Sequence, residues 1–185
     1  MVASMTIVPD DKNWTWVLER RCPECGFDAS SVELVRVGET IRSMNEAWEA
    51  ALRRPSVRDR PSPEVWSPLE YGCHVRDVYR VFDGRLARML AEDHPLFANW
   101  DQDASAIDER YSEQDPAIVA IELVAAAATL AARFDGVEDE QWHRTSERSD
   151  GSVFTVDSFA RYLLHDPIHH LRDVGEPFGV DVGDA

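Results

Sequence analysis

Cysteine and basic residues are scarce in this chain of 185 residues, and both shortages restrict what it can be. The three cysteines, Cys22, Cys25 and Cys73, are too few and odd in number for a disulfide framework, which is typical of a reducing compartment. The 19 Lys and Arg are outnumbered by 35 Asp and Glu, so the formal net charge is −16. Attraction to nucleic-acid backbones and anionic lipid depends on accumulated basic side chains, so we expect neither nucleic acid nor a membrane as a partner.

Long apolar runs and a secretory signal are also missing. No run of about 18 apolar residues stands out. The N-terminus has neither the basic region nor the apolar region of a signal peptide, so we expect a cytoplasmic protein. Apolar residues make up 44% of the chain, and its length suits one domain that buries its own core.

Four segments with helical features predict an all-α fold. The expected helices cover residues 31–54, 67–92, 116–135 and 155–174. Their lengths favour a four-helix bundle over residues 31–175, with long crossover loops between helices. We expect an irregular segment over residues 1–30 and a tail over 176–185. The Asp150-Gly151 turn signal predicts a small hairpin between the third and fourth helices.

Histidines on the fourth helix are the most informative polar residues. His165 and His169 are four residues apart, so both side chains leave the same face one turn apart and could reach one metal ion. Asp173 lies a further turn along and could accept the outer N–H of a ligand histidine. The alternative is a polar helix face that carries histidines without a metal.

His74 on the second helix is the best candidate for a third ligand. It lies at the edge of the apolar stripe of that helix, where a side chain can reach a cleft between helices. Glu70 and Asp77, four residues before it and three after, flank it with carboxylates. The alternative is a hydrogen-bonded histidine at the border of the core.

These residues together resemble a known family. The order Trp66-x3-Glu70-x3-His74-x2-Asp77 followed by His165-x3-His169-His170 is similar to the DinB family of metal-binding four-helix bundles. That family belongs with DinB-like S-transferases and mycothiol-dependent maleylpyruvate isomerases. The resemblance covers about residues 31–175. Pro167, inside the ligand turn, and the Cys-Pro-Glu-Cys-Gly segment depart from the shared pattern.

The resemblance implies a metal site and a chemistry. Its ligands would be His74, His165 and His169, holding one divalent ion, zinc or nickel, while His170 has no matching ligand role. The ion would activate a low-molecular-weight thiol of the mycothiol or bacillithiol type against an electrophilic small molecule. Glu70, Asp77 and Asp173 would orient ligands or move protons. The resemblance also implies a homodimer.

Cys22 and Cys25 admit three interpretations. Cys-x2-Cys-Gly has the form of half a zinc site, but a structural zinc site needs four ligands and no second Cys-x2-Cys exists. The pair could be reduced thiols packed on the bundle, a reversible disulfide, or a zinc half-site completed by a histidine or a second subunit. Cys73 is expected to be a buried small residue.

Two other functions compete with the thiol transferase. A non-catalytic metal-binding protein on the same bundle is the first, because fold and ligands do not by themselves establish turnover. A metal-dependent hydrolase that uses no thiol is the second.

Overall fold

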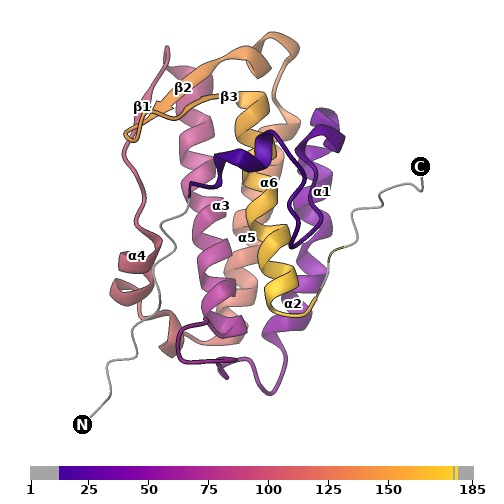
Figure 1. Cartoon of the computed structure of the whole chain (residues 1–185), viewed down its shortest axis with the longest axis vertical. Helices are drawn as coiled ribbons and strands as arrows, with labels where there is room; N and C mark the ends of the chain where they lie inside the picture. The colour runs from indigo at the N-terminus through magenta and orange to yellow at the C-terminus, as the bar shows by residue number, and fades with distance from the viewer. Residues whose placement is uncertain (1–12, 177, 179–185) are drawn as a thin grey trace.

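The computed structural model describes residues 13–176 and 178. Its helices form a bundle with four helical positions around one core. Three long helices, α3 (Pro68–Ala91), α5 (Pro116–Asp135) and α6 (Val156–Asp173), occupy three of these positions. The fourth is the consecutive pair α1 (Val37–Ser43) and α2 (Asn45–Leu52) (Figure 1). The predicted four-helix bundle is therefore present.

The first predicted helix is interrupted, which the periodicity did not indicate. Short 3₁₀ helices η2 (Ala29–Ser31) and η3 (Leu34–Arg36) precede α1, and a turn at Met44 separates α1 from α2. Met44 and Trp48 are both fully buried, so the break does not interrupt the apolar face. The remaining 3₁₀ helices are η1 (Trp14–Leu18), η4 (Tyr111–Glu113) and η5 (Asp139–His143).

A small sheet makes the strict all-α expectation wrong. The predicted hairpin is confirmed as β2 (Thr145–Arg148) and β3 (Val153–Thr155), which pair antiparallel, with Thr145 opposite Thr155. The additional strand β1 (Leu96–Phe97) pairs parallel with β2, with Leu96 opposite Glu147. This sheet lies at one end of the bundle (Figure 1). The expected crossover between α3 and α5 also holds α4 (Gln102–Asp108).

One helix is more apolar than the sequence analysis allowed. Among the described residues, α5 alone is long and apolar enough to cross a membrane by length and composition, with a mean hydropathy of 1.9. The expectation that the chain has no apolar run of about 18 residues is therefore wrong. Its many alanines raise the mean hydropathy although their side chains are small. Leu123, Leu130 and Phe134 on one face of α5 are buried in the bundle core, where α5 packs against α3 and α1.

Caps define the helices that carry the candidate site. Ser67 and Glu70 form a reciprocal capping box at the start of α3, and Pro68 takes its first position. Thr155 and Ser158 form the same arrangement at the start of α6. The helix α6 continues through Pro167 to Asp173. The N-terminal segment lies across α6, with η1 and η2 in contact with it (Figure 1).

Gly38 is required for the contact between α1 and α5. A Cβ atom there would lie 2.1 Å from Asp135 Oδ1 and 2.8 Å from the backbone oxygen of Ala131. Because the backbone of α5 cannot withdraw as a flexible side chain would, Gly38→Ala should destabilise the fold by about 1–3 kcal/mol. Urea unfolding measures this change.

Gly84 provides the matched control. It lies within α3, and a Cβ atom there would meet nothing within 4 Å. Gly84→Ala should therefore stabilise the protein by about 0.5–1 kcal/mol. A loss of stability in both variants would show that the close approach at Gly38 is not the cause.

Candidate metal centres

Two faces of α6 carry different groups of polar side chains. Successive residues of an α-helix are rotated by about 100°. His165 and His169 meet the N-terminal segment, whereas Asp166 and His170, one residue further along, meet His74 on α3. We call His74, Asp166 and His170 the α3–α6 cluster. We call Cys22, Cys25, His165 and His169 the cysteine–histidine cluster.

The α3–α6 cluster has the spacing of ligands around one ion. Its three ligand atoms lie within 4.8 Å of one another. Asp166 Oδ2 is 3.4 Å from His74 Nε2 and 3.9 Å from His170 Nε2. Two ligands bound at about 2.1 Å at a tetrahedral angle would be about 3.4 Å apart. One ion therefore fits between these three side chains with little rearrangement.

Polar atoms of this cluster lack the partners that buried groups normally have. His74 is fully buried, and its Nδ1 has no hydrogen-bond partner. The Oδ1 of Asp166 is also buried and without one. Burial acts to raise the pKa of Asp166, but His74 and His170 outweigh it and hold the pKa at about 2. The carboxylate is thus charged at neutral pH and available to a cation.

Neighbouring groups hold the rings of the α3–α6 cluster. Asp173 Oδ2 lies 3.0 Å from His170 Nδ1, which leaves Nε2 of that ring facing Asp166. Such an outer carboxylate fixes the tautomer of a ligand histidine. Trp100 stacks on His74 with ring centroids 5.6 Å apart and planes at 10°. Tyr71 packs against His170 with centroids 4.8 Å apart.

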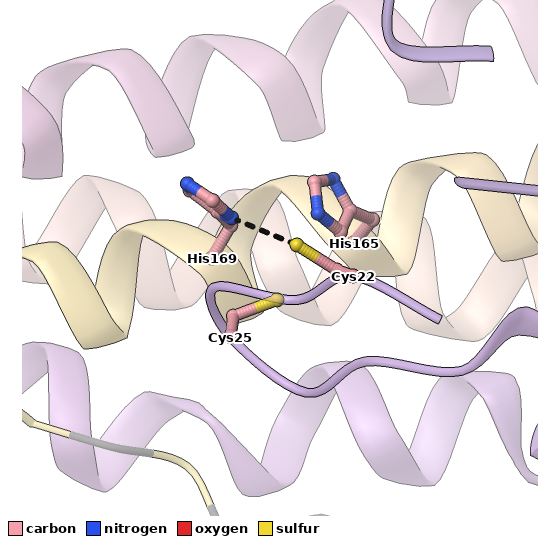
Figure 2. Close-up of side chains that lie close together, drawn as sticks. All are labelled: Cys22, Cys25, His165 and His169. Carbon is pink, nitrogen blue, oxygen red and sulfur yellow. Dashed lines mark hydrogen bonds between the residues drawn. The ribbon is translucent and has the colours of Figure 1, made fainter. Parts of the chain in front are cut away.

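The cysteine–histidine cluster joins the N-terminal segment to α6. Its four ligand atoms lie within 4.8 Å of one another. Figure 2 shows the Cys22 sulfur beside both imidazoles, and Cys25 next to it on the same loop. Cys22 Sγ is 3.7 Å from His169 Nδ1. The Nε2 of His165 is buried and has no hydrogen-bond partner.

Burial keeps three of these groups, His165, His169 and Cys25, uncharged while no cation is bound. It lowers the pKa of His165 to about 4 and also lowers that of His169. Both imidazoles therefore keep a free lone pair at neutral pH. Burial also raises the pKa of Cys25 to about 12, against a backbone hydrogen bond from Phe27 that favours the thiolate.

The structure divides the expected ligand set His74, His165 and His169 between the two clusters. His74 does not join the other two in a group of ligand atoms within 4.8 Å of one another among the described residues. His170, which had no expected ligand role, lies beside His74 instead, with ring centroids 5.0 Å apart. The cause is the helical rotation that turns His165 and His169 away from α3. Asp166 was not identified from the sequence, although its spacing to His170 is the same one-turn spacing.

The carboxylates expected near the site have different contacts. Asp173 lies 3.8 Å from Nε2 of His169, one of the histidines it was expected to orient, and 3.0 Å from Nδ1 of His170, a contact that was not expected. Glu70 instead accepts hydrogen bonds from Ser67 and Arg60, at the start of α3. Asp77 accepts from Arg76, at 2.9 Å, and from the Tyr111 hydroxyl, at 2.6 Å. Glu70 and Asp77 therefore stabilise the fold rather than contact the histidines.

Cys73 is buried, as expected. Burial raises the pKa of its thiol to about 12, and its sulfur lies 3.9 Å from the backbone oxygen of Tyr111. It belongs to neither cluster.

A pocket of about 1240 Å³ adjoins the α3–α6 cluster. Asp166 and His170 line it, together with His165 and His169. Five tryptophan and tyrosine residues also line it: Trp14, Trp66, Tyr71, Trp100 and Tyr162. Arg85 and Arg148 also line it, alongside carboxylates that include Asp101, Asp150 and Asp173.

Comparison with known proteins agrees with this architecture. YfiT from Bacillus subtilis, described as a probable metal-dependent hydrolase with an unusual four-helix bundle topology, has a similar structure, with a TM-score of 0.68 and 17% identity. The match covers 78% of this chain and 89% of YfiT, and at this identity it shows the fold alone. No curated protein matches the sequence. A family model of the DinB superfamily matches residues 38–174. The chain belongs to the DinB superfamily.

Proposed function

We propose that the protein is a divalent-metal-dependent S-transferase. In this proposal His74, Asp166 and His170 hold the metal, and a low-molecular-weight thiol attacks an electrophilic small molecule in the adjoining pocket. The observation that carries the proposal is the α3–α6 cluster, whose three ligand atoms lie within 4.8 Å of one another beside a large pocket.

The number of ligands favours catalysis over a structural role. Three protein ligands leave a coordination position open, as in catalytic sites, whereas structural zinc sites are closed by four. A divalent ion in such a site supplies Lewis acidity that favours deprotonation of a bound thiol or water. The arrangement also matches the family pattern of one ligand from the second helix of the bundle and two, one turn apart, from the fourth. Asp166 then stands where the family carries a histidine.

The surrounding side chains have defined tasks in this proposal. Asp173 holds the His170 ring by its Nδ1–H, so that Nε2 faces the ion. Trp100 and Trp66 pack on His74, with centroids 5.6 and 5.3 Å away, and shield it from water. A shielded site strengthens the electrostatic interactions within it.

The size of the pocket supports a reaction of two organic molecules. Sites for one drug-sized ligand usually measure about 300–1000 Å³. The pocket exceeds this range at about 1240 Å³. A thiol cosubstrate and an electrophile could therefore occupy it together.

One arginine of the pocket, Arg85, supports an anionic substrate group, because Arg148 already pairs with Asp150 at 2.6 Å. Arg85 donates to the backbone oxygen of Ala98 at 2.9 Å and lies over the Phe97 ring, 5.6 Å from its centroid, with no ion pair to a carboxylate among the described residues. Burial and the nearby Arg148 lower the pKa of Arg85, a shift that a bound anion would oppose. A carboxylate or phosphate on the substrate would provide the missing partner.

A metal-dependent hydrolase is the second candidate. The likeness to YfiT, described as a probable metal-dependent hydrolase, favours it. The same ligands and pocket would then activate water in place of the thiol, and no cosubstrate would be needed.

Turnover assays separate these functions. The chelated protein is reloaded with zinc or nickel and mixed with mycothiol, bacillithiol or glutathione and a panel of electrophiles with and without a carboxylate. We expect a conjugate, detected by mass spectrometry, only when metal and thiol are both present, and faster reaction with carboxylate-bearing electrophiles. Metal-dependent hydrolysis of the same compounds or of simple esters without thiol would establish the hydrolase instead. Tight metal binding with no turnover would contradict both enzymes.

A further inference from the structure

The cysteine–histidine cluster lies outside the three ligands of the proposed active site and has a different set of donors. Two thiols come from the N-terminal segment and two imidazoles from α6. We propose that Cys22, Cys25, His165 and His169 bind one zinc ion in a closed, tetrahedral site that fastens the N-terminal segment to α6. This inference does not depend on the proposed enzymatic function.

The backbone between the cysteines is already folded as a tight loop. The N–H of Gly26 donates to the Cys22 oxygen at 2.9 Å, and the N–H of Cys22 donates to the Phe27 oxygen at 2.8 Å. Gly26 has φ of +77°, a conformation that favours glycine. The loop directs both sulfur atoms toward α6 (Figure 2).

The separation of the donors fits a zinc ion. A thiolate at about 2.3 Å from zinc and an imidazole nitrogen at about 2.0 Å lie about 3.5 Å apart at the tetrahedral angle. The distance from Cys22 Sγ to His169 Nδ1 is 3.7 Å. The one-turn spacing of the histidines places the His165 imidazole beside that of His169, with ring centroids 5.0 Å apart, so both rings can reach the same ion.

The chemistry of the donor set selects zinc and a structural role. Two sulfur and two nitrogen ligands in a tetrahedron are typical of zinc, and four protein ligands leave no position for a substrate. Two thiolates and two neutral imidazoles also balance the charge of Zn²⁺. A neutral assembly suits this site, because an uncompensated charge is costly to bury.

Outer carboxylates complete the arrangement. With Nδ1 of His169 toward the sulfur, its Nε2 lies 3.7 Å from Glu24 and 3.8 Å from Asp173. Carboxylates in this position orient ligand histidines. Asp173 therefore contacts one histidine of each cluster, His169 and His170.

The other interpretations of Cys22 and Cys25 explain less. A reversible disulfide would need neither imidazole, and packed thiols would leave His165 Nε2 buried without a partner. The half-site that lacked ligands in the sequence is completed by two histidines of the same chain.

The zinc ion would also shape the active-site pocket. Three residues of the N-terminal segment, Asn13, Trp14 and Glu24, line that pocket. Trp14 packs against both histidines of the cysteine–histidine cluster, with centroids 5.3 and 5.2 Å away. Release of the zinc would free the N-terminal segment and open that side of the pocket.

Cobalt substitution of the full-length protein tests the site. Thiolate-bound Co²⁺ has an intense charge-transfer absorption in the near ultraviolet that histidine and carboxylate ligands do not produce. We expect this absorption in the wild-type protein, and X-ray absorption of a zinc-loaded His74→Ala/His170→Ala variant should show two sulfur and two nitrogen ligands. The cobalt absorption should persist in that variant, which removes two ligands of the other cluster, and in Cys73→Ala, which removes the thiol that belongs to neither.

The double variant Cys22→Ser/Cys25→Ser should lose the absorption and one zinc equivalent per chain. Zinc should also slow alkylation of Cys22 and Cys25 in the wild-type protein by at least about tenfold, a measurement that does not depend on the folding of any variant. The proposal is wrong if wild-type protein lacks the absorption, or if both thiols react equally fast with and without zinc. Recovery of a Cys22–Cys25 disulfide from protein purified with zinc and without oxidant would also contradict it. None of these outcomes tests whether the α3–α6 cluster catalyses thiol transfer.

Discussion

Asp166→Asn should release the metal of the α3–α6 cluster and lower metal-dependent turnover by at least about 100-fold. Loss of a carboxylate that only orients a ligand already costs about 10–100-fold in metal affinity or activity, and Asp166 is proposed to bind the ion directly. Asparagine preserves the shape of the side chain but removes its charge. Titration with zinc or nickel, followed by steady-state kinetics, measures both effects.

Two carboxylates on α6 serve as controls for that substitution. Asp173→Asn should weaken metal binding less, by about 10–100-fold, because Asp173 contacts His170 rather than the proposed ion. Asp157→Asn should leave metal binding unchanged, because Asp157 pairs with Arg161 in the first turn of the helix. Full metal affinity in Asp166→Asn would reject the proposed ligand set.

Arg76→Ala should destabilise the fold by about 3–5 kcal/mol, the cost of breaking a buried ion pair. Only 4% of the Arg76 side chain is exposed, and it donates to Asp77 at 2.9 Å and to Glu122 at 2.9 Å. Its removal leaves the Asp77 carboxylate, which is 15% exposed, without its most buried partner. Urea unfolding monitored by circular dichroism measures the change.

Arg80→Ala is the matched control, because Arg80 contacts the same two carboxylates, both at 3.1 Å. Its side chain is 49% exposed. Exposed ion pairs contribute about 0.2–1 kcal/mol, so the loss should be no larger than that. Equal losses in the two variants would show that burial does not set the strength of these pairs.

The long helices could be predicted closely because their signals are local. Ser67 and Pro68 mark the start of α3, and Thr155 marks the start of α6, each through a cap that involves only neighbouring residues. The Asp150-Gly151 turn located the hairpin for the same reason. The two-residue strand β1 gave no usable pattern, because it exists only through pairing with β2, about 50 residues away.

The candidate site was predictable in part. The spacing of His165 and His169 correctly placed both imidazoles on one face of α6. The periodicity of α6 indicated only that this histidine face points away from the apolar face of the helix. Which element the histidines contact depends on how α6 is rotated within the bundle. The partners of His165 and His169 are Cys22 and Cys25, 140–147 residues earlier in the chain.

By itself, the sequence determined the three long helices, their caps, the family and three histidines able to bind metal. Those properties depend on neighbouring residues and on side-chain chemistry. Only the tertiary structure decided which ligands meet: it places Asp166 and His170 beside His74, and His165 and His169 beside the two cysteines. The physical reason is that adjacent residues on a helix point about 100° apart. The packing of α6 against elements distant in sequence fixes its rotation, and that rotation decides which neighbour each side chain contacts.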